Sequence, residues 1–331
     1  MKNCVNIGQI GVGYWGPNLL RNLVANNNCK VKTVVDLSSE RRSYVQSLYP
    51  KIKVEKHLNA IFDDTEIDAV VIATPVSTHY KFAMQALNAG KHILVEKPMA
   101  TKVAEIENIK SLSEDKNLVA MVGHTFLYNS AVRYIKSLID SGELGDIRYI
   151  YSQRLNLGRI RNDVDVLWNL APHDVSIIQY WLDDVIPINV SRFGMDYIQP
   201  GINDVTFLNV KYPNKIMANI HVSWLDPNKI RRMTIVGTKK MVVYDDIAQD
   251  KVTIYDKGFD LMAKLGDKMD FDKPIHNYIN LRSGDILIPN IAWHEPLKTE
   301  ISHFVDCITK NKKCLTGADH ALVVIKILDS N

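Results

Sequence analysis

Long apolar runs are absent from this chain. No segment of its 331 residues approaches the ~20 consecutive apolar residues that cross a membrane. The beginning, from Met1 to Ile10, lacks the basic-then-apolar layout of a secretory signal and leads directly into a strand pattern. We therefore expect a cytoplasmic protein that has no membrane partner.

Cysteine is scarce, and neither sign of charge dominates. Cys4, Cys29, Cys307 and Cys314 form no Cys-x-x-Cys pair, so reduced thiols are expected rather than a disulfide framework. His303, Cys307 and Cys314 could be imagined as metal ligands, but a helix with two buried thiols is the favoured interpretation, and no metal is expected. The net charge of +3, from 40 Lys+Arg and 37 Asp+Glu, is too small for a nucleic-acid surface and compatible with an acidic small molecule.

The composition is that of a globular protein with two domains. Hydrophobic residues make up 46% and charged residues 23% of a chain that is too long for one small core. Up to residue 125, short apolar strand patterns alternate with helix patterns, which indicates a doubly wound parallel sheet of the α/β class. The strand patterns are Val5–Ile10, Val31–Val35, Ile52–Val54, Ala69–Ala73, His92–Val95 and Leu118–Val122.

The pattern changes after Gly123. Strand patterns now follow one another with few helices between them, which indicates a largely antiparallel sheet. Helices are expected at Ala131–Ile139 and Leu167–Trp181, and strands at Ile147–Leu155, Val205–Tyr212, Ile216–Val222, Met233–Val236, Met241–Tyr244 and Val252–Tyr255. Gly258–Asn290 is expected to be irregular, and Pro296 opens a last helix.

A glycine-rich turn follows the first strand pattern. Gly11, Gly13 and Gly16 have the G-x-G-x-x-G spacing, which permits a tight turn, close backbone approach to a pyrophosphate and close helix packing. The N–H groups of the next helix would face the phosphates. Asp36 ends the second strand, where a carboxylate accepts hydrogen bonds from the adenosine ribose and repels a 2′-phosphate. The sequence therefore predicts NAD as the cofactor of a Rossmann domain over residues 1–125.

Glu96-Lys97-Pro98 follows the strand pattern His92–Val95. Open α/β sheets place their active sites at this carboxyl end of the strands. Pro98 restricts Lys97 to extended geometry and so directs its ammonium group. Such a lysine can polarise a carbonyl or pass a proton to an alkoxide, although a lysine at a strand end is more often a solvated surface group.

Together these motifs resemble the Gfo/Idh/MocA oxidoreductase family, named after glucose–fructose oxidoreductase and inositol dehydrogenase. The resemblance covers nearly the whole chain and rests on Gly11–Gly16, Ala73-Thr74-Pro75 with His79, Glu96-Lys97-Pro98 and the helix with His173-Asp174. It implies a Rossmann domain followed by a C-terminal α+β domain, residues 126–331, whose open-faced, mostly antiparallel sheet binds substrate and mediates oligomerisation. It also implies that Lys97 is catalytic. The cofactor-binding residues expected are Gly11, Gly13, Tyr14, Trp15, Gly16, Asp36, Ala73, Thr74, Pro75, His79, Glu96 and Lys97.

The second motif departs from the family in one position. The family has an Asp followed four residues later by a His; here His173 occupies the second position and Asn169 the first. Because residues four apart share a helix face, Asn169 can still hydrogen-bond towards substrate or His173. It supplies no negative charge to raise the basicity of the imidazole. We expect His173 to assist Lys97 in catalysis and Asn169 to orient the substrate.

The closest resemblance within the family is to nucleotide-sugar 3-dehydrogenases of surface-polysaccharide synthesis, which act on UDP-N-acetylglucosamine or its uronic acid. It implies hydride transfer at the sugar C3 and a homodimer or homotetramer. Binding of a nucleotide sugar calls for cationic side chains near its diphosphate and for flat side chains near its nucleotide base. The candidates are Arg154, Arg159, Arg161, Arg231 and Arg232 for the first, and Phe126, Tyr128 and Trp224 for the second.

Three alternatives stay open. An NADPH-type 3-ketoreductase of dTDP-sugars is compatible with Arg41 and Arg42 beside Asp36. An NAD-dependent glycosidase of the same fold would oxidise its substrate only transiently. A catalytically silent ligand sensor is favoured by Asn169 and opposed by Lys97.

Overall fold

The computed structural model describes residues 4–158, 160–162, 164–261 and 279–330, and the chain divides into two compact units. Unit 1 holds the residues up to 129 together with residues 293–330, and unit 2 holds residues 130–292. The prediction that residues 126–331 form one domain therefore needs a correction. The last segment packs with unit 1, where its apolar residues Leu297, Ile301 and Phe304 are buried. Chain order alone could not reveal this return.

A six-stranded sheet, parallel throughout, forms the centre of unit 1. Its order β3-β2-β1-β4-β5-β6 is the usual Rossmann order, in which the direction of the connections reverses between β1 and β4. All side chains of β4 are buried, as expected when helices cover both faces. The strands are β1 (Val5–Ile10), β2 (Cys29–Val35), β3 (Lys53–Glu55), β4 (Ala69–Ile72), β5 (His92–Glu96) and β6 (Ala120–Gly123). The predicted doubly wound α/β fold is confirmed.

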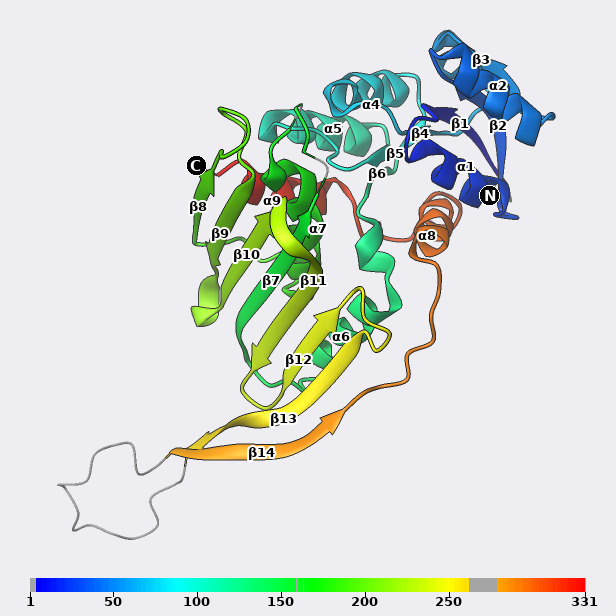
Figure 1. Ribbon diagram of the computed structural model, residues 1–331. Helices are drawn as coiled ribbons and strands as arrows, with labels where there is room; N and C mark the ends of the chain where they lie inside the picture. Colours follow the sequence, from blue (N-terminus) through cyan, green and yellow to red (C-terminus); the bar gives the residue numbers. More distant parts are fainter. Residues whose placement is uncertain (1–3, 159, 163, 262–278, 331) are drawn as a thin grey trace, which may run out of the picture. The chain divides into compact units, whose positions relative to one another are not determined.

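The helices of unit 1 connect these strands, and the two last helices of the chain join them. Figure 1 shows α8 beside α1. The segment before α9 reaches the edge strand β6, where Val122 N donates to Thr316 O at 2.8 Å. The prediction of one last helix missed α9. The bounds are α1 (Gly16–Val24), α2 (Ser39–Leu48), α3 (Asn59–Phe62), η1 (Val76–Thr78), α4 (His79–Asn88), α5 (Val103–Asp115), η2 (Thr125–Tyr128), α8 (Pro296–Lys310) and α9 (Ala318–Leu328).

Unit 2 is built on an eight-stranded sheet of order β14-β13-β12-β11-β7-β10-β9-β8. Every neighbouring pair is antiparallel except β7 with β10, so the predicted mostly antiparallel sheet is confirmed. Figure 1 shows β13 and β14 as a long paired ribbon at one edge of this sheet. The elements are α6 (Ser130–Asp140), β7 (Ile147–Leu157), α7 (Val166–Trp181), β8 (Asn189–Met195), β9 (Val205–Lys211), η3 (Pro213–Lys215), β10 (Met217–Ser223), β11 (Leu225–Gly237), β12 (Met241–Asp245), β13 (Val252–Leu261) and β14 (Ile279–Leu287).

Two strands of unit 2, β8 and β14, are not predicted by the sequence. Strand β8 has exposed apolar side chains that give no core pattern. The expectation that Gly258–Asn290 is irregular was wrong at both ends, because β13 extends to Leu261 and pairs with β14. Residues 262–278 of that stretch lie outside the described residues.

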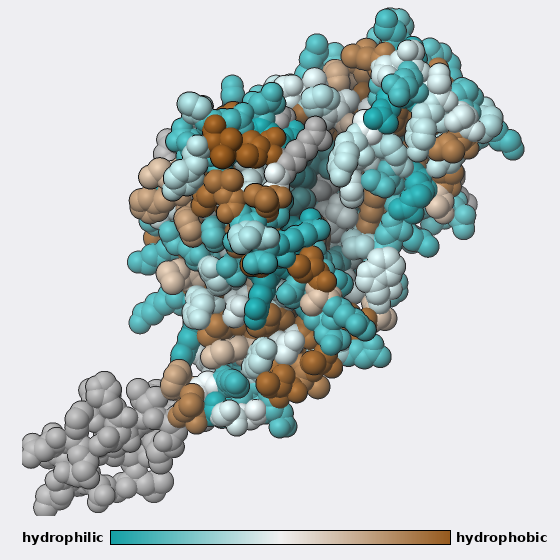
Figure 2. Space-filling model, viewed as in Figure 1, coloured by the Kyte–Doolittle hydropathy of each residue, from teal (hydrophilic) through white to brown (hydrophobic). Residues whose placement is uncertain are grey.

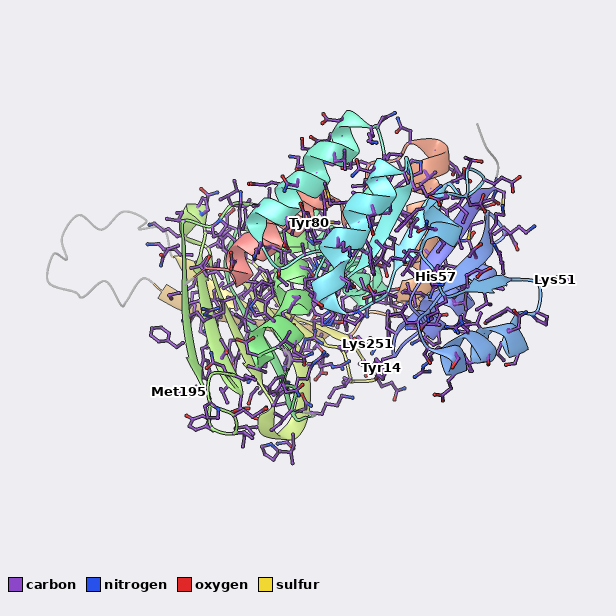
Figure 3. The ribbon with its side chains drawn as sticks, turned by 90° about the horizontal axis from the view of Figure 1, so that it is seen from above. Tyr14, Lys51, His57, Tyr80, Met195 and Lys251 are labelled. Atoms are coloured by element: carbon purple, nitrogen blue, oxygen red, sulfur yellow. The ribbon has the colours of Figure 1, made fainter. Side chains whose placement is uncertain are left out.

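One face of the second sheet carries a mixture of apolar and polar side chains that reach solvent. In β9 and β10 alternate residues are buried, and the others, including Phe207, Met217 and His221, lie on the opposite face. The rings of Phe207 and His221 stack there with centroids 4.1 Å apart. Met195, labelled in Figure 3, is exposed at the end of β8. Figure 2 shows apolar side chains in separate groups among hydrophilic ones on the side that it presents. Within the described ranges, no helix has the length and hydropathy needed to cross a bilayer.

Candidate active site

The glycine-rich turn joins β1 to α1 at the carboxyl end of the parallel sheet. Gly11 has φ +91°, and a Cβ there would lie 2.5 Å from Ala73 O, so only glycine fits. A Cβ on Gly16 would lie 2.5 Å from Gly11 O, whereas a Cβ on Gly13 would meet no atom within 4 Å. The space at Gly13 is where a pyrophosphate oxygen can approach the backbone. The turn therefore fits a dinucleotide phosphate group.

Asp36 is fixed beside this turn. Its Oδ2 accepts from Val12 N at 2.8 Å, and its Oδ1 accepts from Ser38 N at 2.9 Å. Arg42 donates to the backbone carbonyl oxygens of Asp36 and Leu37, at 2.8 and 2.9 Å. The carboxylate is thus held where a ribose hydroxyl would reach it, and the Arg42 guanidinium is bonded to the main chain. Arg41 is exposed.

His79 lies behind the turn that follows β4, not on its surface. The side chain is 1% exposed, and its ring nitrogens lie 2.8 Å from the carbonyl oxygens of Pro98 and Thr74. The pKa of His79 lies below its ordinary value. Burial is the main cause and the charge of Lys97 adds to it, and together they outweigh the two carbonyl contacts, which raise the pKa. His79 therefore connects the segments of Thr74 and Pro98, and its expected place in lining the cofactor stays a prediction. Ala73, Thr74 and Pro75 are partly or fully exposed at the same end of the sheet.

Glu96 and Lys97 end β5 at this same end. Burial raises the pKa of Glu96 to about 7, against the lowering effects of the Lys97 charge and of hydrogen bonds from Lys97 N and the Trp15 side chain. The bond from Trp15 ties the lysine turn to the glycine-rich turn. Lys97 itself is partly buried, and its peptide bond to Pro98 is cis. Tyr14, located in Figure 3, is 94% exposed on the glycine-rich turn.

In unit 2, Asn169 and His173 lie one turn apart on α7. The helix begins at Asp165, whose Oδ1 caps it by accepting from Trp168 N at 2.9 Å. Asn169 Oδ1 accepts from Trp224 Nε1 at 3.2 Å, which holds the amide in one orientation. Both side chains are partly exposed, as a substrate-binding role requires.

Comparison with protein families covers both units. The profile described as "Oxidoreductase family, NAD-binding Rossmann fold" matches residues 5–124, and the profile described as "GFO/IDH/MocA C-terminal domain" matches residues 132–243. The chain belongs to the Gfo/Idh/MocA family. Unit 1 therefore contains the NAD-binding Rossmann domain of an oxidoreductase family, as predicted.

The similar proteins described next share 18–29% of their residues with this chain over the matched parts. A 4-carboxy-2-hydroxymuconate-6-semialdehyde dehydrogenase of a Sphingobium species is 29% identical over a match that covers 56% of this chain and 61% of that protein's length. UDP-N-acetylglucosamine 3-dehydrogenase of Acidithiobacillus ferrooxidans is 27% identical over 76% of this chain and 77% of its own. The solved structure of that enzyme, GnnA, has a TM-score of 0.80 at 23% identity and covers 98% of this chain and 95% of its own. GenD2 from gentamicin A biosynthesis, solved with NAD, has a TM-score of 0.80 at 18% identity, over 99% of this chain and 93% of its own. At these identities the two structures show a common fold.

Three residues expected to bind substrate in this Gfo/Idh/MocA protein are committed elsewhere. Arg154 is 5% exposed and donates to the buried Asp174 from Nε at 2.7 Å and from Nη2 at 3.1 Å, so it anchors α7 to β7. Tyr128 is 1% exposed in unit 1, with its hydroxyl 3.3 Å from Thr316 Oγ1. Trp224 is 1% exposed. In the described structure these three side chains fill the core or an ion pair, and their expected contact with substrate stays a prediction that burial does not favour.

The other candidates for substrate binding differ in how exposed their side chains are. Arg161 and Arg232 are exposed, Phe126 is partly exposed, and Arg231 Nη1 lies 3.4 Å from Asp246. Arg159 lies outside the described residues.

A buried polar cluster behind Lys97 escaped sequence analysis. Glu300 of α8 is 0% exposed and accepts from Thr125 Oγ1 at 2.7 Å. Burial and the charge of Glu96 raise the pKa of Glu300 well above its usual value. Burial, His320 and Lys97 lower the pKa of His124 well below its usual value. These groups come from the segment that follows β6, from α8 and from α9, so only the folded chain brings them together. His124-Thr125 directly after a strand was the signal in the sequence.

Proposed function

We propose that the protein is an NAD-dependent oxidoreductase that transfers a hydride between nicotinamide and C3 of a nucleotide sugar. The sugar would be a UDP-N-acetylhexosamine or its uronic acid, used in surface-polysaccharide synthesis. The observation that carries this proposal is the link between Lys97 and the glycine-rich turn. Glu96 accepts hydrogen bonds from Lys97 N and from the Trp15 side chain, so the lysine stands at the cofactor end of the sheet.

NAD is favoured over NADP by Asp36. Its carboxylate is fixed by two backbone N–H groups and stays available to ribose hydroxyls on its outer lone pairs. A 2′-phosphate would bring like charges together, which costs several kcal/mol on the scale of such contacts. Arg42, bonded to backbone carbonyls, does little to offset this cost.

Proton transfer is assigned to Lys97. Bound nicotinamide supplies or accepts the hydride. As the hydride leaves the sugar carbon, the hydroxyl proton must leave as well, and a positioned lysine can take it and stabilise charge on the oxygen. In unit 2, His173 would assist with the proton and Asn169 would orient the sugar. Asn169 is neutral, so His173 has no carboxylate there to raise its basicity.

The substrate class is supported by one relative and by the exposed cations. A UDP-N-acetylglucosamine 3-dehydrogenase is 27% identical over 76% of this chain. With Arg154 withdrawn into the core, Arg161 and Arg232 are the exposed candidates for a diphosphate. We further propose a homodimer or homotetramer formed through the open face of the second sheet, because exposed apolar side chains there, such as Phe207 and Met217, favour a protein partner.

A thermal-shift panel of UDP-, dTDP- and GDP-sugars, each with NAD or NADP, tests the proposal. A UDP-sugar with NAD should raise the unfolding temperature most, and the same pair should then yield NADH. Matched samples of Lys97→Met separate binding from turnover, because the variant should keep the thermal shift and lose NADH formation. Release of a monosaccharide without net NADH would favour the glycosidase. Ligand-induced stabilisation without any turnover would favour the sensor. A preference for dTDP-sugars with NADPH would favour the 3-ketoreductase.

A further inference from the structure

Two thiols and one imidazole meet in unit 1, where the ring centroid of the imidazole lies 5.6 Å from that of Tyr128. His303 and Cys307 stand four residues apart on α8 and therefore share a face, and Cys314 precedes α9. Their ligand atoms all lie within 4.8 Å of one another, and His303 Nε2 is 3.4 Å from Cys307 Sγ. We propose that His303, Cys307 and Cys314 form a binding site for one Zn²⁺ ion.

The chain reverses after α8 in a way that brings the third ligand back. Helix α8 ends at Lys310, and Asn311 takes the left-handed conformation, with φ +52°, that commonly terminates a helix. Lys310 and Lys312, on either side of Asn311, both pair with Asp306 at 2.7 Å. This local structure fixes the turn, and Cys314 returns to the face of α8 that carries the other two ligands.

The distances suit tetrahedral zinc. Bond lengths of about 2.0–2.1 Å to nitrogen and about 2.3 Å to sulfur place N and S about 3.5 Å apart, and two sulfurs about 3.8 Å apart. The observed 3.4 Å between His303 and Cys307 agrees, and Cys314 needs only a small adjustment. Two sulfurs with one imidazole nitrogen are a donor set for zinc-type cations and not for Mg²⁺ or Ca²⁺.

The imidazole nitrogen of the proposed site already accepts a hydrogen bond, which a cation would have to displace. Leu315 N donates to His303 Nε2 at 3.0 Å, so this nitrogen carries a lone pair and no proton. A cation at the site takes that lone pair in place of the amide. Cys307 is buried, whereas His303 and Cys314 are partly exposed, which leaves an entry path and a fourth position for water.

The site would tie α8 to the edge of the Rossmann sheet. Directly after Cys314, Thr316 O accepts from Val122 N at 2.8 Å, and Gly317 bridges to Met121 in β6. A cation held by both segments binds the folded state and not the unfolded chain, and therefore stabilises unit 1. Zn²⁺ at this site would have no part in the proposed enzymatic reaction.

Cobalt provides a spectroscopic test on the full chain. In a Cys4→Ser/Cys29→Ser background the two remaining thiols are Cys307 and Cys314. After reduction and removal of metal, anaerobic titration with Co²⁺ should give one ion per chain, thiolate charge-transfer absorption and the visible bands of tetrahedral Co²⁺. Zn²⁺ should abolish these bands and raise the unfolding temperature. The parent chain with Cys4 and Cys29 intact is the matched control and should behave identically.

Variants of the ligands decide the outcome. Cys307→Ser and Cys314→Ser should each lose most of the charge-transfer absorption, and His303→Asn should raise the Co²⁺ dissociation constant at least about tenfold. Unchanged bands in the cysteine variants, or no thiolate band when both thiols titrate as reduced, would overturn the proposal. Should a variant fail to fold, X-ray absorption of the zinc-loaded Cys4→Ser/Cys29→Ser protein decides: two sulfur neighbours support the site, and a shell of nitrogen and oxygen alone refutes it.

Discussion

Glu96→Gln should make the protein more stable at alkaline pH and leave it unchanged at acid pH. Burial raises the pKa of Glu96 from 4.5 to about 7. Because the folded-state pKa is the higher one, the stability that protonated Glu96 provides is complete below about pH 4.5 and is lost as pH rises through about 7. At about 1.4 kcal/mol per pH unit, the loss is roughly 3 kcal/mol. Glutamine keeps the shape of the protonated acid and never ionises, so the variant avoids this loss.

Thermal unfolding of variant and wild type between pH 4.5 and 8.5 measures the effect. For a unit of this size, roughly 3 kcal/mol corresponds to about 6–10 °C at pH 8, shrinking to nothing near pH 4.5. The Glu96 charge also raises the pKa of Glu300, so its removal acts there in the same direction. Glu107→Gln, on the exposed surface of α5, is the matched control and should follow wild type at every pH. A Glu96→Gln difference that is constant across the pH range would refute the reasoning.

Three further outcomes follow from particular contacts. Gly13→Ala should fold normally, because its Cβ meets open space, and should bind NAD at least about tenfold more weakly. Gly16→Ala should lose both stability and NAD binding, and melting curves with calorimetry distinguish the two variants. Asp174→Asn should cost about 3–5 kcal/mol in urea unfolding, because it leaves buried Arg154 without its carboxylate, and equal stability would show the pair to be dispensable. Sedimentation should give a dimer or tetramer that Phe207→Asp weakens; a monomer at micromolar concentration would disprove the sheet-face interface.

The sequence predicted those elements of the fold whose residues are neighbours in the chain. Strand β1 has the predicted bounds, and most other strands differ by only a few residues. The failures concern β8, β14 and α9, although β8 and β14 each pair with a strand next to them in the chain. Strand β8 exposes Phe193 and Met195, and β14 is defined by its pairing with β13, so neither carries the apolar alternation of a core strand.

Prediction of the site succeeded where function depends on the backbone. The turn geometry at Gly11 and Gly16 is visible in the spacing of glycines, because no other residue fits there. Side-chain roles were harder, because an arginine or tyrosine in a sequence carries no sign of burial. The sequence therefore indicates Arg154 and Tyr128 as ligands, although both are buried in the structure. The sequence raised His303, Cys307 and Cys314 as a possible set of ligands, but whether Cys314 returns to the other two depends on how the chain turns at Asn311.

The most direct test of the proposed reaction is the rate of NADH formation from NAD and UDP-N-acetylglucosamine, or its uronic acid, by wild type and Lys97→Met. A positioned proton-transfer group typically contributes ~10²–10⁴ in rate, so we expect turnover to fall by that factor. The dissociation constant for NAD should change little, because the phosphate-binding turn is formed by Gly11–Gly16 and not by the lysine. A Lys97→Met enzyme with near-normal turnover would contradict the assignment of catalysis to Lys97.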